Sequence, residues 1–221
     1  MADVKWLTFD AYGTLVDFDI SGAIVEALGD RKERIDLEEF LRVCERDRYE
    51  EVLGSYRPYR EILRTSLRKS METFGLEYRD ADGDHLIARV PTFGPFPDAP
   101  PVLERLRQHF KLVIISNTED DLIAGNLERL GVPIDVVITA EQAQGYKPSL
   151  DVFRYTFDRL GADPSEIVHI AQGFDYDIVP ASQLGLRRIW INRRGRAGDP
   201  AYGPYDEVPD LTGVPGLLDI E

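Results

Sequence analysis

Asp10 is the first residue whose type and position favour chemistry, because it directly follows an apolar run. That run contains Val4, Trp6, Leu7 and Phe9, a composition typical of a strand that is buried on both faces of a parallel sheet. At the carboxyl end of such a strand the loops diverge and leave a crevice in which ligands bind. A carboxylate there is placed to act on a ligand, whereas the structural alternative is a cap on a tight turn.

Polar side chains also follow the later apolar runs. Ser116 and Asn117 end one run, Lys147 precedes a proline that opens a helix, and Asp177 follows another run. Because the carboxyl ends of parallel strands meet at one edge, we expect these residues to converge with Asp10. An ammonium group can neutralise a carboxylate, and a second carboxylate can take a proton. Taken singly, the serine and asparagine also fit a helix cap, and the lysine a surface loop.

These side chains require a sheet whose strands alternate with helices, and the second half of the chain has that pattern. Short apolar runs predict strands, and apolar residues at helical spacing predict the segments between them. We therefore expect an α/β fold with a doubly wound parallel sheet. The expected strands are 4–9, 112–115, 134–138, 167–171 and 188–191, and the expected helices are 98–110, 122–130, 150–160 and 178–184.

Four amphipathic segments without an intervening strand separate the first strand from this alternating half. They are expected as helices at 18–28, 36–53, 59–74 and 82–90. A stretch rich in proline and glycine at 90–102 then returns the chain to the sheet. We expect a core domain formed by residues 1–16 and 92–221, with a helical cap domain at 17–91 inserted into it.

Composition limits the classes of function. The chain has 221 residues, 43% of them hydrophobic, and a net charge of −14, which disfavours binding to a nucleic-acid backbone. Cys44 is the only cysteine, so neither an intrachain disulfide nor a cysteine metal cage is expected. No apolar run approaches the roughly 20 residues of a membrane span, and the first strand begins too early for a signal peptide. We expect a cytoplasmic protein that does not bind membranes.

Two further groups of polar residues carry weaker signals. His85, His109 and His169 share no metal-ligand spacing, and we expect surface or packing positions for them. The arginines within 193–196 predict a solvated basic turn that pairs with acids of the C-terminal segment.

Four sequence motifs together resemble those of the haloacid dehalogenase superfamily. The segment FDAYGTL at 9–15 resembles its nucleophile motif, SNT at 116–118 its second, GYKPSLDVF at 145–153 its third, and HIAQGFDYDIVPASQLGL at 169–186 its fourth. The resemblance implies a Rossmann-like core with a helical cap and a covalent intermediate on the first aspartate. The catalytic residues that it implies are Asp10, Thr14, Lys147 and Asp177.

Two positions distinguish the reactions of that superfamily. Its phosphatases usually carry an acid where Tyr12 stands, to protonate the leaving group, and a magnesium-binding acid where Gln172 stands. Mg²⁺ prefers anionic oxygen ligands, so an amide weakens that site, although Asp175 lies two residues from Asp177. A halide leaves without protonation, so the resemblance favours the 2-haloacid dehalogenases.

The dehalogenase pattern is itself incomplete. Gln172 and Phe174 stand where those enzymes usually have Ser and Asn, and Phe153 stands where they have Tyr. They also use an arginine at the start of a cap helix to hold the halide, and we expect Arg42 in that role. The remaining substrate-binding residues that the resemblance implies are Tyr12, Ser116, Asn117 and Gln172, with Arg46 and Arg48 expected on the solvated face of the cap.

Three hypotheses follow from this resemblance. The first is a hydrolase of the 2-haloacid dehalogenase type, which acts on a small anionic substrate without a cofactor. The second is a phosphatase with a degenerate fourth motif, in which Asp10 and Asp177 bind Mg²⁺. The third is a non-catalytic member that binds a ligand or partner. The resemblance also implies a homodimer as one state of assembly.

Overall fold

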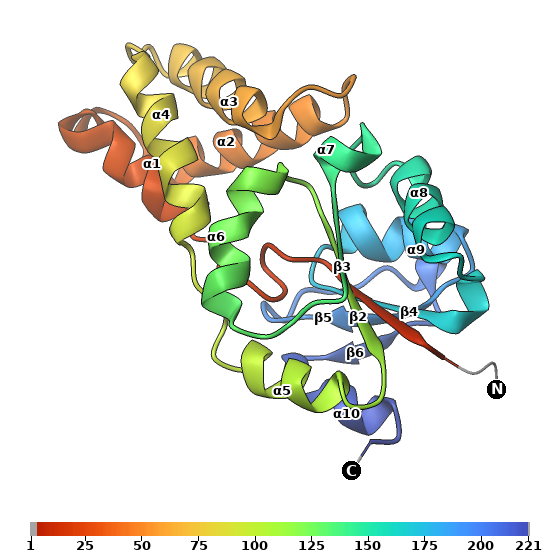
Figure 1. Ribbon diagram of the computed structural model, residues 1–221. Helices are drawn as coiled ribbons and strands as arrows, with labels where there is room; N and C mark the ends of the chain where they lie inside the picture. The colour runs from red at the N-terminus through yellow and green to blue at the C-terminus, as the bar shows by residue number, and fades with distance from the viewer. Residues whose placement is uncertain (1–3, 221) are drawn as a thin grey trace.

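A six-stranded parallel sheet forms the centre of the computed structural model, which describes residues 4–220 (Figure 1). The strand order is β3-β2-β1-β4-β5-β6, so the chain builds outward from β1 on one side and then continues on the other. This reversal leaves a crevice at the carboxyl ends of β1 and β4. The predicted α/β class with a doubly wound parallel sheet is confirmed. The strands are β1 (Trp6–Phe9), β2 (Lys111–Ser116), β3 (Val136–Thr139), β4 (Ile167–Ala171), β5 (Arg187–Ile191) and β6 (Asp206–Val208).

Helices cover both faces of the sheet. Successive residues of a strand point to opposite faces, so the apolar side chains on each face need helices to bury them. Leu7 and Phe9 of β1 belong to the same buried cluster as Leu103 of α5. Ile115 of β2 belongs instead to a cluster with Phe153 of α8. The helices of this half are α5 (Ala99–Leu106), α6 (Asp120–Leu130), α7 (Ala140–Ala143), α8 (Leu150–Leu160), α9 (Val179–Gln183) and α10 (Val214–Leu217).

Four helices lie between β1 and α5 in the chain and gather at one end of the molecule (Figure 1). Asp19 and Asp36 cap two of them, each accepting a hydrogen bond from a backbone N–H of the first turn. We propose that residues 17–91 form a cap domain and that 1–16 and 92–221 form the core; of these, 1–3 and 221 lie outside the described residues. The cap helices are α1 (Ile20–Leu28), α2 (Leu37–Val52), α3 (Tyr59–Thr73) and α4 (Asp80–Arg89).

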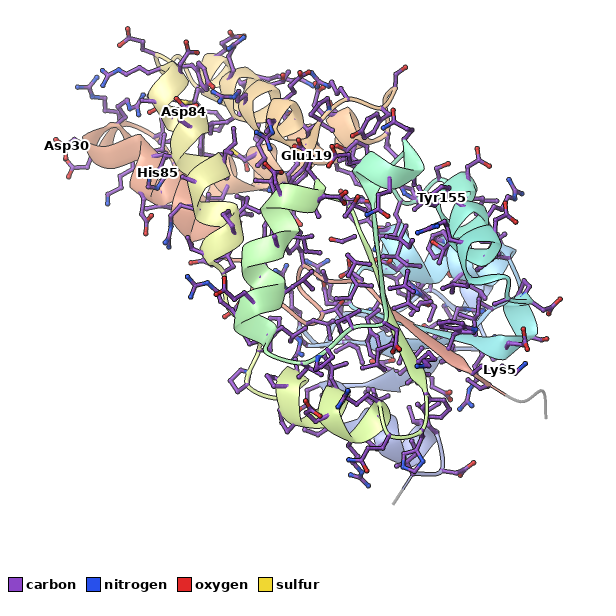
Figure 2. All side chains as sticks on the ribbon, in the orientation of Figure 1. Lys5, Asp30, Asp84, His85, Glu119 and Tyr155 are labelled. Carbon is purple, nitrogen blue, oxygen red and sulfur yellow. The ribbon has the colours of Figure 1, made fainter. Side chains whose placement is uncertain are left out.

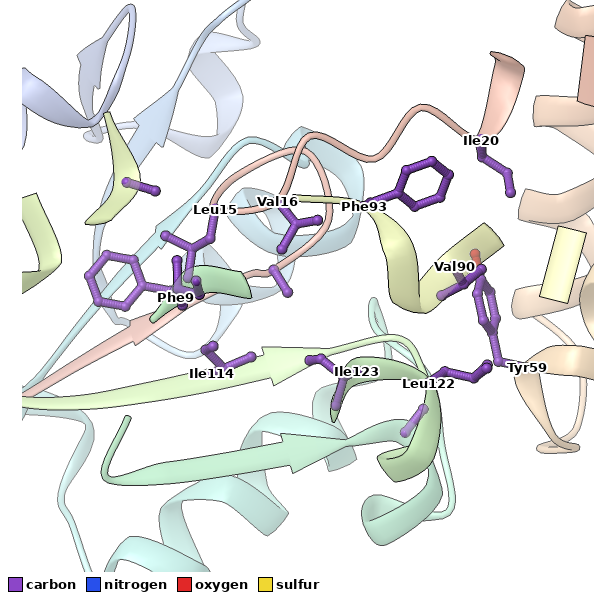
Figure 3. Close-up of a cluster of buried hydrophobic side chains, with 14 of the residues drawn as sticks. Phe9, Leu15, Val16, Ile20, Tyr59, Val90, Phe93, Ile114, Leu122 and Ile123 are labelled. Atoms are coloured by element: carbon purple, nitrogen blue, oxygen red, sulfur yellow. The ribbon is translucent and has the colours of Figure 1, made fainter. Parts of the chain in front are cut away.

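The chain enters and leaves this insertion side by side. Val16 and Pro95 form an antiparallel bridge, and the Phe96 N–H donates to the Leu15 carbonyl at 2.9 Å. The Asp17 N–H donates to the Gly94 carbonyl, also at 2.9 Å. Figure 3 shows buried side chains continuing from the sheet past this joint into the helices of the insertion. The two crossings therefore form one short ribbon.

Polar contacts also connect α3 with the core. Arg60 donates from its backbone N–H and from Nε to the Glu119 carboxylate, both at 2.8 Å, and pairs with Asp121. Glu119 precedes α6 and faces the helices of the insertion (Figure 2). The Tyr146 hydroxyl donates to the Arg57 carbonyl at 2.7 Å. These polar contacts and the ribbon together hold the insertion against the edge of the sheet.

The structure differs from the sequence prediction in its shorter elements. The helix expected at 98–110 ends at Leu106, and the one expected at 178–184 follows a π-helical turn at Phe174–Ile178. Strand β6 was not predicted, because two of its three residues are acidic. Within residues 4–220, no helix is long and apolar enough to cross a membrane.

Candidate active site

Asp10 lies directly after β1, where the chain turns sharply at Gly13. Gly13 has φ +90°, and a Cβ there would lie 3.0 Å from Gln172 Oε1, so both conformation and space favour glycine. The turn brings the buried Thr14 back to Asp10, and its hydroxyl donates to Asp10 Oδ2 at 2.7 Å. The same hydroxyl oxygen accepts the Gln172 backbone N–H at 2.8 Å. Thr14 therefore ties the Asp10 carboxylate to the loop that follows β4.

Lys147 lies between two buried carboxylates. Its Nζ is 2.9 Å from Asp10 Oδ1 and 2.6 Å from Asp177 Oδ1, and its side chain is 1% exposed. One ammonium thus faces two carboxylates from different loops, as the parallel topology predicts. A buried charge persists only when it is paired, so each member of this triad depends on the other two.

Asn117 holds the backbone of Lys147 in place. The Lys147 N–H donates to Asn117 Oδ1 at 2.8 Å, and Asn117 Nδ2 donates to the Lys147 carbonyl at 2.9 Å. The amide also lines the cavity described below. Ser116 is buried, and its hydroxyl has no hydrogen-bond partner among the described residues.

His169 is a contact of Asp177 that sequence reasoning missed. It is fully buried in β4, and its Nε2 lies 3.1 Å from Asp177 Oδ1. Its Nδ1 lies 2.8 Å from the hydroxyl of Thr8, its neighbour in the register of β1 and β4. Phe153 packs edge-on against the imidazole, at 5.2 Å between ring centres. By contrast, His85 on α4 pairs with Glu26 within the insertion (Figure 2).

The two carboxylates have pKa values shifted in opposite directions. Burial raises the pKa of Asp10 above its ordinary value, although the Lys147 charge opposes this effect. Burial also acts to raise the pKa of Asp177, but Lys147 and the His169 hydrogen bond outweigh it and lower that pKa. The two carboxylates in turn raise the pKa of Lys147 against the effect of burial. Opposite shifts in neighbouring acids are typical of sites that use them differently.

The hydroxyl of Tyr12 is hydrogen-bonded to α6, and its ring stacks on an aromatic neighbour. The hydroxyl donates to Asn126 Oδ1 at 3.1 Å, and the ring stacks on Phe18 at 4.3 Å between centres. Burial raises the pKa of this phenol. Asn126, also missed in the sequence, donates to the carbonyls of Val90 and Phe93 at 2.8 and 2.9 Å. Tyr12 is therefore anchored to α6 and to the return crossing from the insertion.

A cavity of about 530 Å³ opens above Asp10, between the insertion and the sheet edge. Arg48 of α2 is half-buried in its wall and has no ion pair or hydrogen bond with any residue in 4–220. Arg42 also borders the cavity, but its side chain is 71% exposed and its Nε donates to Glu39 at 2.9 Å. Arg46 pairs with the buried Asp47 at 2.8 Å. Arg48, expected on the solvated face, is thus the unpaired guanidinium of α2 at the cavity.

Gln172 and Arg193 complete the surroundings of the Asp10 loop. Gln172 lines the cavity, and its carbonyl accepts the Trp190 indole N–H at 3.1 Å. Arg193 was expected in a solvated turn, but it pairs with Asp98 at 2.9 Å and donates to the Thr14 carbonyl. The prediction for Arg193 is wrong, because the last loop folds back over the Asp10 turn.

The oxygen donors near Asp10 do not fit Mg²⁺. Asp10 and Asp177 both bind the Lys147 ammonium, and Gln172 offers a neutral amide. Asp175 is exposed at the outer part of the cavity. Nowhere in 4–220 do three or more His, Cys, Asp or Glu side chains gather as a metal site. Mg²⁺ favours octahedral coordination by anionic oxygens and water, which this set does not provide.

Comparisons with known proteins agree with this geometry. A family model of haloacid dehalogenase-like hydrolases matches residues 4–185. The chain is 26% identical over 202 residues to (S)-2-haloacid dehalogenase 4A of Burkholderia cepacia, covering 89% of this chain and 86% of that one. It is also 26% identical to (S)-2-haloacid dehalogenase 1 of Pseudomonas sp. strain CBS-3, covering 99% and 98%. The L-2-haloacid dehalogenase of Xanthobacter autotrophicus has the same fold, with a TM-score of 0.82, 23% identity and 98% of both chains covered. The resemblance found in the sequence motifs is thereby confirmed, and the chain belongs to the haloacid dehalogenase-like hydrolase family.

Proposed function

We propose that this hydrolase removes halide from a 2-halocarboxylic acid, through an ester formed on Asp10. The observation that supports this most directly is the buried triad in which Lys147 bridges Asp10 and Asp177. Two relatives that match 89% and 99% of this chain are both named (S)-2-haloacid dehalogenases, and these names support the same substrate class.

In the first step, an oxygen of Asp10 attacks C2 of the substrate. A C–O bond forms as the carbon–halogen bond breaks, and the halide leaves with the bonding electrons. Lys147 and Thr14 hold one carboxylate oxygen each, so the attacking group is fixed in place. The step needs no acid to protonate the leaving group, which agrees with a tyrosine at position 12 whose hydroxyl is bonded elsewhere.

In the second step, water attacks the Asp10 carbonyl carbon and the ester bond breaks. Asp177 takes one proton from the water and gives it to the alkoxide oxygen as the C–O bond to Asp10 breaks, so the product leaves as the 2-hydroxy acid. Asp10 is left as a carboxylic acid and becomes a carboxylate again by losing its proton to solvent. Lys147 and His169 both approach Oδ1 of Asp177, while no residue in 4–220 donates a hydrogen bond to its Oδ2. That second oxygen is the one we assign to the water. A positioned base of this kind contributes about 100-fold or more.

We assign the binding of the anionic substrate to Arg48 rather than to Arg42. Arg48 reaches the cavity without a carboxylate partner, whereas Arg42 is occupied by Glu39. A cation is needed here because the chain carries a net charge of −14, which disfavours the approach of an anion. A guanidinium matches a carboxylate in geometry and also attracts a departing halide.

Halide and phosphate release measured on one preparation test the proposal. We expect chloride release from one enantiomer of 2-chloropropionate or of its longer homologues, independent of added Mg²⁺. We expect no phosphate from p-nitrophenyl phosphate with or without Mg²⁺. Metal-dependent phosphate release without any halide would refute the proposal and favour a phosphatase. If neither halide nor phosphate is released, the result would favour a non-catalytic binding role.

The covalent intermediate can be tested separately by intact mass. We expect the Asp177→Asn variant to accumulate an adduct equal to the substrate minus hydrogen halide, on the peptide that contains Asp10. An Asp10→Asn variant, which keeps the shape of the side chain, is the matched control and should form no adduct. An adduct on any other residue would remove Asp10 from the role of nucleophile.

A further inference from the structure

The cavity above Asp10 is much larger than the smallest 2-haloacids. Its volume is about 530 Å³. 2-Chloropropionate has six non-hydrogen atoms, and even at the about 30 Å³ that each water occupies in the liquid it would take up only about 180 Å³. Cavities of several hundred Å³ are typical of sites that enclose substantially larger ligands. The cavity therefore has room for a substantially larger ligand.

The insertion supplies five apolar side chains to the cavity wall, beside two tyrosines and five polar or charged side chains. Ile20 and Ile24 come from α1, Leu41 and Val52 from α2, and Phe18 from the segment that precedes α1. Figure 3 shows Ile20 well removed from Phe9, the neighbour of the reacting carboxylate. Water makes few favourable contacts with these apolar side chains. An alkyl or aryl group, in contrast, is stabilised when it moves from bulk water into contact with them.

The charged groups at the outer cavity do not call for a second anionic group on the substrate. Arg42 and Arg46 are paired with carboxylates of their own helix. The acids Glu45 and Asp175 border the same region. Arg48, Arg194 and Arg196 are then the arginines at the cavity that have no ion pair with any residue in 4–220. Outside the Lys147 triad these three cations face two acids, so one substrate carboxylate balances the excess positive charge.

We infer that the substrate is a 2-halocarboxylic acid that carries an extended apolar group on C2, of about four carbons or more. This inference rests on the proposed function and names its substrate class. The carboxylate faces Arg48, C2 faces Asp10, and the apolar group occupies the space between α1 and α2. A methyl group on C2 leaves that space to water.

A chain-length series tests this inference with the intact protein. Chloride release is measured for single enantiomers of 2-chloropropionate, 2-chlorobutanoate, 2-chlorohexanoate and 2-chlorooctanoate. Full burial of one methylene corresponds to about 0.8 kcal/mol, or about fourfold in kcat/KM. We therefore expect kcat/KM for 2-chlorohexanoate to exceed that for 2-chloropropionate by at least about tenfold. A flat or falling series overturns the inference and leaves the proposed function standing, whereas no chloride from any acid overturns both.

A pair of variants locates the effect in the insertion. Leu41→Trp fills part of the cavity, and Leu41 is half-buried, so the larger ring has room to adjust. We expect it to lower the ratio of kcat/KM for 2-chlorohexanoate to that for 2-chloropropionate by about fivefold or more. Leu53→Trp is the matched control, because Leu53 is 55% exposed and does not border the cavity. An unchanged ratio in a folded Leu41→Trp protein, or an equal loss in both variants, would contradict the assignment.

Discussion

Replacing Lys147 by methionine tests the electrostatics of the site more directly than any other change. Methionine has a similar length but no charge, so the variant leaves Asp10 and Asp177 facing each other with no cation between them. Removal of one partner from a buried ion pair typically costs about 3–5 kcal/mol. We expect a cost of about 3 kcal/mol at pH 7.5, because one carboxyl can take up a proton and so relieve part of the repulsion.

The dependence of this cost on pH is the decisive observation. In the variant the folded state holds a carboxyl whose pKa lies above its value in the unfolded chain, so the folded state binds the extra proton. Stability then falls as pH rises through that pKa and recovers on acidification. In the parent protein the pKa of Asp177 is lowered, so this carboxylate contributes no pH dependence between pH 5.5 and 7.5. Burial raises the pKa of Asp10 in the parent, but Lys147 opposes that rise; the variant lacks this opposition and takes up the extra proton more readily. The deficit of the variant should therefore shrink by about 1 kcal/mol or more between pH 7.5 and 5.5.

Urea unfolding of four proteins measures these quantities. They are the parent, Lys147→Met, Asp177→Asn and the double variant. Asp177→Asn keeps the pair between Lys147 and Asp10, so it should cost less than Lys147→Met. The double variant should be more stable than the sum of the two single effects predicts, by about 1 kcal/mol or more. A deficit that stays constant or grows on acidification, together with additive effects, would show that the buried triad is not charged as described.

Three further changes have separate expected outcomes. Asp10→Asn should lower halide release at least about 1000-fold in a protein that remains folded; turnover at the parent rate, with the amide intact by mass spectrometry, would exclude Asp10 as nucleophile. Arg48→Ala should raise KM for the haloacid by about tenfold or more, whereas Arg42→Ala should change it less than about twofold. Both KM values come from initial-rate kinetics, and the reverse order would assign the binding of the substrate anion to Arg42. His169→Leu removes a hydrogen bond that lowers the pKa of Asp177, so the acid limb of the rate profile for ester hydrolysis should move to higher pH. His169→Gln, which keeps a donor, should restore part of that shift, and an unshifted profile for the leucine variant would show that His169 only packs.

The order of strands and helices was largely predictable because hydrophobic periodicity is a local signal. The runs around Leu7, Ile114 and Ile170 are apolar wherever the sheet is covered on both faces, and the polar residue after each run marks a strand end. Convergence of Asp10, Lys147 and Asp177 then follows from parallel topology without knowledge of a single distance. Strand β6 was not predictable, since its acidic residues become a strand only by pairing with β5.

Side-chain partners across the fold were less predictable, because they depend on which face an element presents after packing. The position of His169 within an apolar run indicated burial, but its contact with Asp177 requires the return of the chain eight residues later through a π-helical turn. Arg42 and Arg48 lie on the same helix, and only its orientation against the sheet edge decides which of them is unpaired at the cavity. An arginine beside an acid at i−3, as with Glu39 and Arg42, is a signal that could have been used against Arg42.

The ribbon formed by residues 15–17 and 94–96 has a consequence for how this chain can diversify. Because the insertion starts and ends at the same place, it joins the sheet in the way a single turn would, whatever its length or sequence. Lengthening a loop whose ends are already held together costs little entropy. Changes in α1 and α2 can therefore reshape the wall that we propose receives the substrate's side group, while the carboxylates and the lysine at the sheet edge keep their positions. The residues that we propose select the substrate and those that we propose react with it therefore lie on separate stretches of the chain. Each set can change without the other.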